Sequence, residues 1–180
     1  MGKQAVRFAS VVAPEQTRVD YHKVLPEAMR AMRGLEQAVH QSSLEAALLE
    51  LVRLRASQLN RCAYCVDMHT KDARARGERE QRLYLVSAWR EAPIYSARER
   101  AALAWCDALT LLPETGAPVQ VYKELERVFS PKDIVALTLA IVAINGWNRF
   151  AVGLRAPVGD YVSPYGKPEA SDLLRGLGSP

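Results

Sequence analysis

Apolar residues recur at the spacing of an α-helix along almost the whole chain, and this periodicity limits the folds open to it. No run alternates convincingly between apolar and polar residues with the period of two that marks a half-buried β-strand. A chain of 180 residues can bury one core and is short for two. We therefore predict an all-α, single-domain bundle of about six to eight helices over residues 1–155, followed by an extended tail rich in Pro and Gly over 156–180.

Capping residues and prolines predict where the helices begin. Ser42 and Ser96 each precede a glutamate by three residues, which is the spacing of a capping box. Asn60 is a favourable N-cap residue, and Pro131 after Ser130 is typical of the first position of a helix. The expected helices cover residues 26–40, 42–59, 60–77, 80–90, 96–112, 118–128 and 132–150.

Composition and charge exclude several classes of protein. Apolar residues make up 49% of the chain and charged residues 24%, as in ordinary globular domains. The longest apolar run, 135–145, is too short to span a bilayer, so no membrane partner is expected. The net charge is +4, but Lys and Arg alternate with Asp and Glu along the chain, as in 74–82, and form no basic block. We therefore expect no nucleic-acid partner. No glycine-rich phosphate loop occurs, so we expect no cofactor.

Two cysteines and a histidine lie close together in NRCAYCVDMH, residues 60–69. The N-terminal MGKQAVRFAS lacks the apolar stretch of a secretory signal, so we expect a cytoplasmic location, where close cysteines are more often catalytic or metal-binding than permanently bridged. On a helix Cys62, Cys65 and His69 project from one face. Because a helix start lowers the pKa of a thiol, this pair suits nucleophilic attack and cycling between dithiol and disulfide.

A zinc site is the main chemical alternative for this trio, and an inert helix with coincidental cysteines is another. The CxxC pair and histidine supply three ligands, and Glu50 or Asp67 offers a fourth. A structural zinc site normally draws a second ligand pair from a distant segment, but Cys106, His22 and His40 are isolated. We therefore expect no metal, a buried structural thiol at Cys106, and surface or capping roles for the two histidines.

Glu50 lies at the border of the apolar arc of its helix, where two interpretations compete. A partly buried carboxylate has a raised pKa and suits a general base. Spacing alone favours the simpler interpretation, an ion pair with Arg53 or Arg55.

The amides and arginine of 145–149 interrupt the most apolar helix and need partners. We expect them to satisfy a subunit interface or to line a cavity near the thiols. Trp147 is therefore a supporting site candidate, although Trp89, Trp105 and Trp147 at helical spacing are more typical of a core.

The stretch from Glu50 to His69 resembles the signature of the alkylhydroperoxidase-D-like group within the carboxymuconolactone decarboxylase superfamily. In that group a glutamate precedes CxxC by twelve residues and a histidine follows the second cysteine by four, and both spacings occur here. Residues 143–150 are similar to its closing helix and 26 onward to its opening helix. The resemblance covers roughly residues 20–152.

This resemblance implies an alkylhydroperoxidase-D-like helical bundle with antioxidant peroxidase activity, associating into dimers, trimers or hexamers. It implies that Cys65 attacks the hydroperoxide, that Cys62 resolves the product, and that Glu50 and His69 form a proton relay. Tyr64 stands where the founding pattern has a further histidine, so Tyr64 and neighbouring Asn60 are supporting candidates. A separate disulfide-reducing protein or dithiol must restore the thiols.

Two other functions compete with peroxide reduction. The superfamily also contains lactone decarboxylases, which generally lack the CxxC pair, so the two cysteines here favour thiol chemistry. A general disulfide reductase or redox sensor would use the same dithiol on protein substrates.

Overall fold

The computed structural model describes residues 16–165, which form nine α-helices, one short 3-10 helix and no β-strand. This confirms the predicted all-α fold. The count exceeds the expected range by one, because the four-residue helices α1 and α7 are too short to carry a periodic signal. The helices are α1 Tyr21–Val24, α2 Pro26–His40, α3 Ala46–Leu59, α4 Ala63–Ala75, α5 Glu80–Leu85, α6 Ala97–Thr110, α7 Leu112–Thr115, α8 Val119–Glu126 and α9 Pro131–Leu154, with the 3-10 helix at Val86–Ala88.

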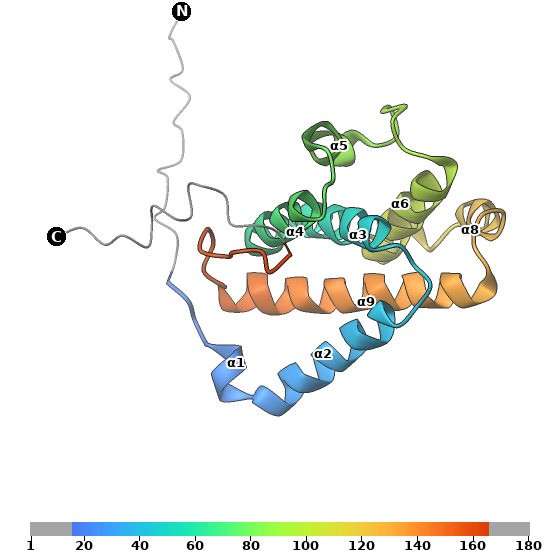
Figure 1. Ribbon diagram of the computed structural model, residues 1–180. Helices are drawn as coiled ribbons and strands as arrows, with labels where there is room; N and C mark the ends of the chain where they lie inside the picture. The colour runs from blue at the N-terminus through green and yellow to red at the C-terminus, as the bar shows by residue number, and fades with distance from the viewer. Residues whose placement is uncertain (1–15, 166–180) are drawn as a thin grey trace, which may run out of the picture.

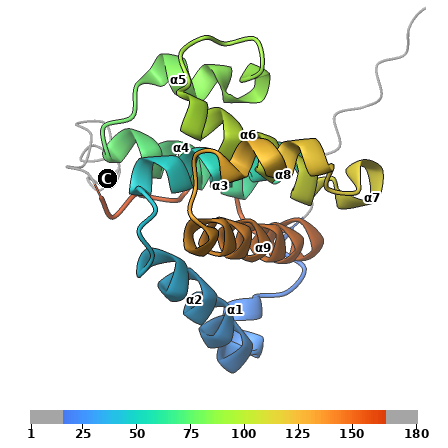
Figure 2. The same ribbon diagram turned by 90° about the vertical axis from the view of Figure 1, so that its right-hand side faces the viewer.

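Helix α9 is the central element of the bundle (Figure 1). Viewed nearly along its axis, it lies between α2 on one side and the layer of α3, α4, α6 and α8 on the other (Figure 2). Helix α3 packs against α4, α6 and α9. The main core lies between α3, α6 and α9 and includes the buried side chains of Val52, Cys106, Leu137, Ile141 and Ile144. Burial of each large aliphatic side chain contributes about 1.5–3 kcal/mol, which holds these helices in a fixed arrangement.

By length and composition, α9 is the one helix in the described part of the chain that is long and apolar enough to cross a membrane. In the bundle it packs against α2, α3 and α6, as the central helix of a globular core does. Its outward face keeps Val135, Val142 and Val152 exposed.

The helix starts predicted from Ser96 and Ser130 are confirmed, and the one predicted from Ser42 is wrong. Ser96 forms the expected capping box with Glu99, and the Ser130 side chain caps the N-terminus of α9 ahead of Pro131. The capping box predicted at Ser42 does not form, and α3 begins only at Ala46. The Ser42 hydroxyl instead donates to the Val39 carbonyl at 2.6 Å, because the chain turns there after α2.

The capping preference of Asn60 predicts that it begins a helix, but in the structure it ends one. It is the C-cap of α3, the next residue Arg61 has a left-handed φ of 54°, and Cys62 is the N-cap of α4. Helices α4, α5 and α8 are also shorter than predicted and end at Ala75, Leu85 and Glu126. Beyond α5 the chain continues as the 3-10 helix Val86–Ala88, which keeps Val86 buried.

The segment after α9 folds back over α4, and the structure describes it as far as residue 165. Between the end of α9 and that residue it contains no helix or strand. The Lys71 ammonium donates to the carbonyl oxygens of Gly159 and Tyr161, at 3.2 and 2.8 Å. The predicted extended tail is thus fixed to the helix of the CxxC motif along its first part, and its remainder, 166–180, lies outside the described residues.

Candidate active site

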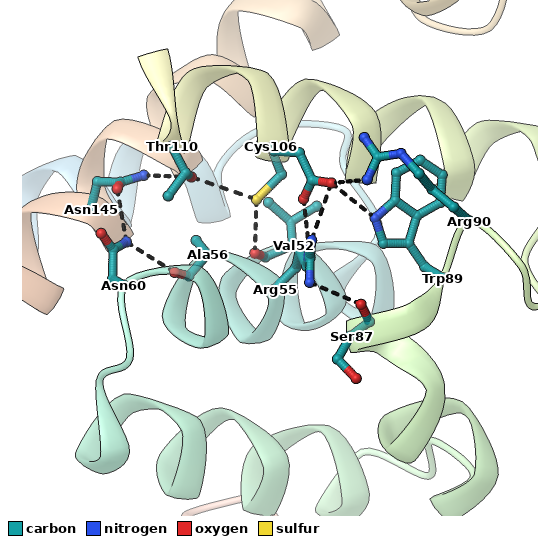
Figure 3. A network of polar contacts seen from close by, with 11 residues as sticks. Val52, Arg55, Ala56, Asn60, Ser87, Trp89, Arg90, Cys106, Thr110 and Asn145 are labelled. Atoms are coloured by element: carbon teal, nitrogen blue, oxygen red, sulfur yellow. Dashed lines mark hydrogen bonds and ion pairs between the residues drawn. The ribbon is translucent and has the colours of Figure 1, made fainter. Parts of the chain in front are cut away.

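The α3–α4 turn is anchored to α9 by side-chain amides. Asn60 Nδ2 lies 2.9 Å from Asn145 Oδ1 and 2.8 Å from Asn148 Oδ1. Asn145 in turn donates to Thr110 of α6 at 3.1 Å, so the turn is connected to both α9 and α6 (Figure 3). Ser57, at the end of α3, accepts a further bond from Asn148 at 3.2 Å. The polar residues predicted to need partners therefore find them within the subunit, where they fix the start of α4.

Cys62 and Cys65 are joined by a disulfide at the start of α4, with Cα atoms 5.3 Å apart. Both residues are only 1% exposed and pack against Ala151 of α9, with Tyr64 and Ala156 beside them. The Cys62 sulfur accepts the Cys65 backbone N–H at 3.3 Å, in the position of an N-cap side chain. The pair therefore lies at the positive end of a helix, where negative charge on sulfur is favoured.

Glu50 and His69 form a buried pair beside the cysteines. His69 Nδ1 lies 2.9 Å from Glu50 Oε2, and Glu50 Oε1 accepts a 2.9 Å bond from Arg53. Burial acts to raise the pKa of Glu50, but its interactions with His69 and Arg53 outweigh burial and hold that pKa below its usual value. Glu50 is thus an ionised acceptor: the expected ion pair with Arg53 is confirmed, and the raised pKa that the partly buried position suggested is wrong, because His69 and Arg53 stabilise the carboxylate.

The second ring nitrogen of His69, Nε2, is buried and has no hydrogen-bond partner among the described residues. His69 lies one helical turn after Cys65, on the same face of α4. Since Glu50 holds Nδ1, Nε2 is the ring nitrogen left to exchange a proton with a neighbouring group.

A cavity of about 400 Å³ opens beside the disulfide, within the size range of small-molecule sites. Its wall includes Glu50, Tyr64, Cys65, His69 and Trp147, whereas Cys62 is not among its lining residues. Trp147 therefore faces a pocket, while Trp89 and Trp105 are buried in the core as expected. His22 and His40 also line the cavity, so their predicted surface or capping roles were incomplete.

Tyr64 takes the place of the histidine in the founding family pattern. Burial, reinforced by the charges of Asp72 and Asp67, raises the pKa of its phenol. Tyr64 is thus a neutral hydroxyl at neutral pH and cannot act as a base in the way an imidazole can.

Sequence reasoning missed the more distant parts of this wall. Tyr21, Asp72, Tyr161 and Tyr165 all line the cavity. Three of them lie at least 41 residues from the nearest cysteine, and no local pattern marks them. A pattern could have identified Asp72 only through its helical spacing of three from His69.

Cys106 is buried and is not among the residues that line the cavity. It is fully buried, its thiol lies 3.4 Å from the Val52 carbonyl oxygen, and it contacts Thr110 (Figure 3). Burial, followed by the charge of Asp107, raises the pKa of this thiol to about 12. The prediction of a buried structural thiol is confirmed.

Among residues 16–165, the acidic and imidazole groups close enough to hold a metal ion are Glu50, His69 and Asp72, whose ligand atoms lie within 4.8 Å of one another. Within this group both carboxylates already have partners, since Glu50 bonds His69 and Arg53 and Asp72 accepts from Tyr161. Asp67, considered as a zinc ligand, pairs with Lys71 at 2.9 Å.

A family model and known relatives match this chain and agree with the resemblance found in its sequence. Residues 26–108 match the model of the carboxymuconolactone decarboxylase family. The uncharacterized protein YdfG of Bacillus subtilis (strain 168) is 41% identical over 137 residues, which cover 76% of this chain and 93% of YdfG. These matches include the whole segment from Glu50 to His69.

Solved structures share the fold. ATU0492 from Agrobacterium tumefaciens, a putative antioxidant defence protein AhpD, is 48% identical with a TM-score of 0.78, covering 81% of this chain and all of that one. The debrominase Bmp8 is 20% identical with a TM-score of 0.66, covering 75% and 73%, so its likeness is one of fold alone. The protein belongs to the carboxymuconolactone decarboxylase family, as an AhpD-like member.

Proposed function

We propose that this protein is a thiol peroxidase that reduces organic hydroperoxides through a dithiol–disulfide cycle of Cys62 and Cys65. Family membership supports a peroxidase-related or antioxidant role. The observation that carries the finer proposal is the convergence of Cys65 and the buried Glu50–His69 pair on one cavity. That cavity brings a nucleophile, a proton acceptor and space for a small organic molecule together.

The first step uses Cys65 as the nucleophile. In the reduced protein the Cys65 thiol gives its proton to His69 Nε2, and the Glu50 carboxylate stabilises the resulting imidazolium through Nδ1. The thiolate attacks the terminal peroxide oxygen, the O–O bond breaks, and the alkoxide leaves. His69 returns the proton to it, so the products are an alcohol and a sulfenic acid on Cys65.

The second step closes the disulfide. The Cys62 sulfur attacks the sulfenic sulfur of Cys65 and water leaves. A Cα separation of 5.3 Å lies within the range that disulfides require. The assignment of roles follows exposure to the cavity: Cys65 lines it, whereas Cys62 lies behind at the N-cap.

The cycle ends when an external dithiol or a disulfide-reducing protein supplies two electrons and restores both thiols. No cofactor is needed for these steps. A cytoplasmic location agrees with such a reductant, and we propose association into a homo-oligomer, for which the exposed valines of α9 offer an apolar surface.

Cysteine variants test the proposal. Reduced Cys62→Ser treated with cumene hydroperoxide should accumulate a sulfenic acid that dimedone traps, while Cys65→Ser should not, and Cys106→Ser should behave as wild type. Trapping in Cys65→Ser alone would reverse the roles. Lactone turnover that survives loss of both active-site cysteines would favour decarboxylation, and disulfide exchange without peroxide consumption would favour a disulfide reductase.

A further inference from the structure

Aromatic side chains from four separate elements converge on the cavity that contains Cys65. Tyr21 comes from α1, Tyr64 from α4, Trp147 from α9, and Tyr161 and Tyr165 from the segment after α9. Aromatic rings offer large apolar contact areas and prefer edge-to-face or offset packing against another ring. A wall of this kind favours a ligand that itself carries a ring.

Hydrogen bonds to both the hydroxyl and the backbone carbonyl of Tyr161 fix its position in this wall. Its hydroxyl lies 2.8 and 3.0 Å from the two carboxylate oxygens of buried Asp72, to which it donates. Its ring meets Tyr64 edge-on, with centroids 6.5 Å apart. Lys71 binds the carbonyl oxygens of Gly159 and Tyr161. Tyr161 cannot move aside for a bulky ligand without breaking several of these bonds.

A second contact holds the segment beyond Tyr161. The Arg76 guanidinium lies 3.5 Å above the ring of Tyr165, the geometry of a cation–π interaction. Lys71, Asp72 and Arg76 all belong to α4 or to its C-cap. The positions of Tyr161 and Tyr165 relative to Cys65 are therefore set by contacts with one helix.

We infer that Tyr161, positioned by Asp72, is a specificity-determining residue that restricts the cavity to compact, ring-bearing organic hydroperoxides and excludes long-chain ones. This inference rests on the proposed function. Two observations support it: the cavity of about 400 Å³ is near the small end of ligand sites, and its walls are aromatic on several sides. Tyr161 itself takes no part in bond making or breaking.

Substrate competition between three hydroperoxides tests this assignment. We compare kcat/KM for cumene hydroperoxide, tert-butyl hydroperoxide and linoleic acid hydroperoxide. In Tyr161→Ala the preference for cumene over linoleic acid hydroperoxide should fall at least about tenfold, because one wall is removed. Tyr161→Phe keeps the ring and loses the bonds to Asp72, so the same ratio should fall about threefold. Tyr84→Ala, a change at a tyrosine that is 68% exposed on α5, should leave the ratio unchanged.

A second readout does not depend on peroxidase activity. In a Cys62→Ser background, reduced Cys65 is alkylated by N-ethylmaleimide or by N-dodecylmaleimide and followed by mass. Tyr161→Ala should raise the dodecyl rate at least about tenfold and change the ethyl rate less than about threefold. If the wild type consumes no peroxide, the proposed function is wrong. The ratio of the dodecyl to the ethyl alkylation rate then tests by itself whether Tyr161 restricts the cavity. Unchanged substrate and alkylation ratios in Tyr161→Ala would overturn the assignment.

Discussion

Replacing Glu50 with glutamine should slow the oxidation of Cys65 by hydroperoxide about 100-fold, the usual scale of a lost acid–base contribution. The Glu50 carboxylate makes two charge-assisted hydrogen bonds of 2.9 Å, one with His69 and one with Arg53. Glutamine preserves the shape of the side chain but carries no charge. The imidazolium that forms when His69 accepts the thiol proton therefore loses its stabilising partner.

The same change should lower the free energy of unfolding by about 1.5–3 kcal/mol, because hydrogen bonds to charged groups contribute that much each and glutamine can keep one of the two. Screening by solvent does not reduce this figure much, since the Glu50 side chain is only 5% exposed. Urea denaturation of both proteins in the disulfide form measures the difference.

The stability difference between wild type and Glu50→Gln should depend on pH in a defined direction. The folded-state pKa of Glu50 lies below its usual value, so its stabilisation is complete above the usual glutamate pKa of about 4.3. That stabilisation is lost as the pH falls through the folded pKa. The gap between the two unfolding free energies should therefore be widest near neutral pH and narrow in acid.

Stopped-flow measurement of thiol oxidation gives the rate, and Glu36→Gln is the matched control. Glu36 pairs with the same Arg53 at 2.6 Å and has no contact with His69. The control should lose stability while its oxidation rate stays within about threefold of wild type. Equal slowing in both variants, or no slowing in Glu50→Gln, would refute a role for Glu50 through His69.

Three further substitutions test other parts of the site and its support. Tyr64→His restores the imidazole of the founding family pattern and should raise the rate of Cys65 oxidation about tenfold in stopped-flow experiments; an unchanged rate would show that the relay does not pass this position. Asn148→Ala removes buried bonds to Asn60 and Ser57 and should lower the free energy of unfolding by about 1–3 kcal/mol in urea denaturation. Gly146→Ala places a methyl group 2.9 Å from the terminal carbon of Met32, a flexible end that can shift, so the cost should be about 1 kcal/mol, and a loss above about 3 kcal/mol would mean that α2 cannot adjust on α9.

Sequence patterns predicted those parts of the fold that local chemistry controls. Periodicity identified the long helices, and side chains that bond their own backbone marked the starts of α6 and α9 at Ser96 and Ser130. The same logic failed at Asn60, because its amide bonds Asn145 and Asn148, which follow it by 85 and 88 residues. A capping preference depends only on neighbouring residues, so it cannot predict hydrogen bonds to partners so far along the chain.

Within the candidate site, too, the sequence predicts the residues that lie close together on one helix and not those that tertiary contacts bring together. Cys62, Cys65 and His69 share one helix, so their spacing placed them together, and Glu50 joined them through the family resemblance and its position on the adjacent α3. The aromatic wall could not be predicted, because it is assembled by tertiary contacts of α1, α9 and the segment 156–165 with α4. Tyr161 in particular has no periodic or motif signal.

The most direct test of the central claim is the stoichiometry of one oxidation. One equivalent of cumene hydroperoxide is added to the reduced, metal-free protein, and free thiols, residual peroxide and intact mass are followed together. We expect one peroxide consumed for every two thiols lost, a mass decrease of two hydrogens, and a Cys62–Cys65 disulfide in the peptide map. Peroxide that persists while both thiols remain free would contradict the peroxidase assignment.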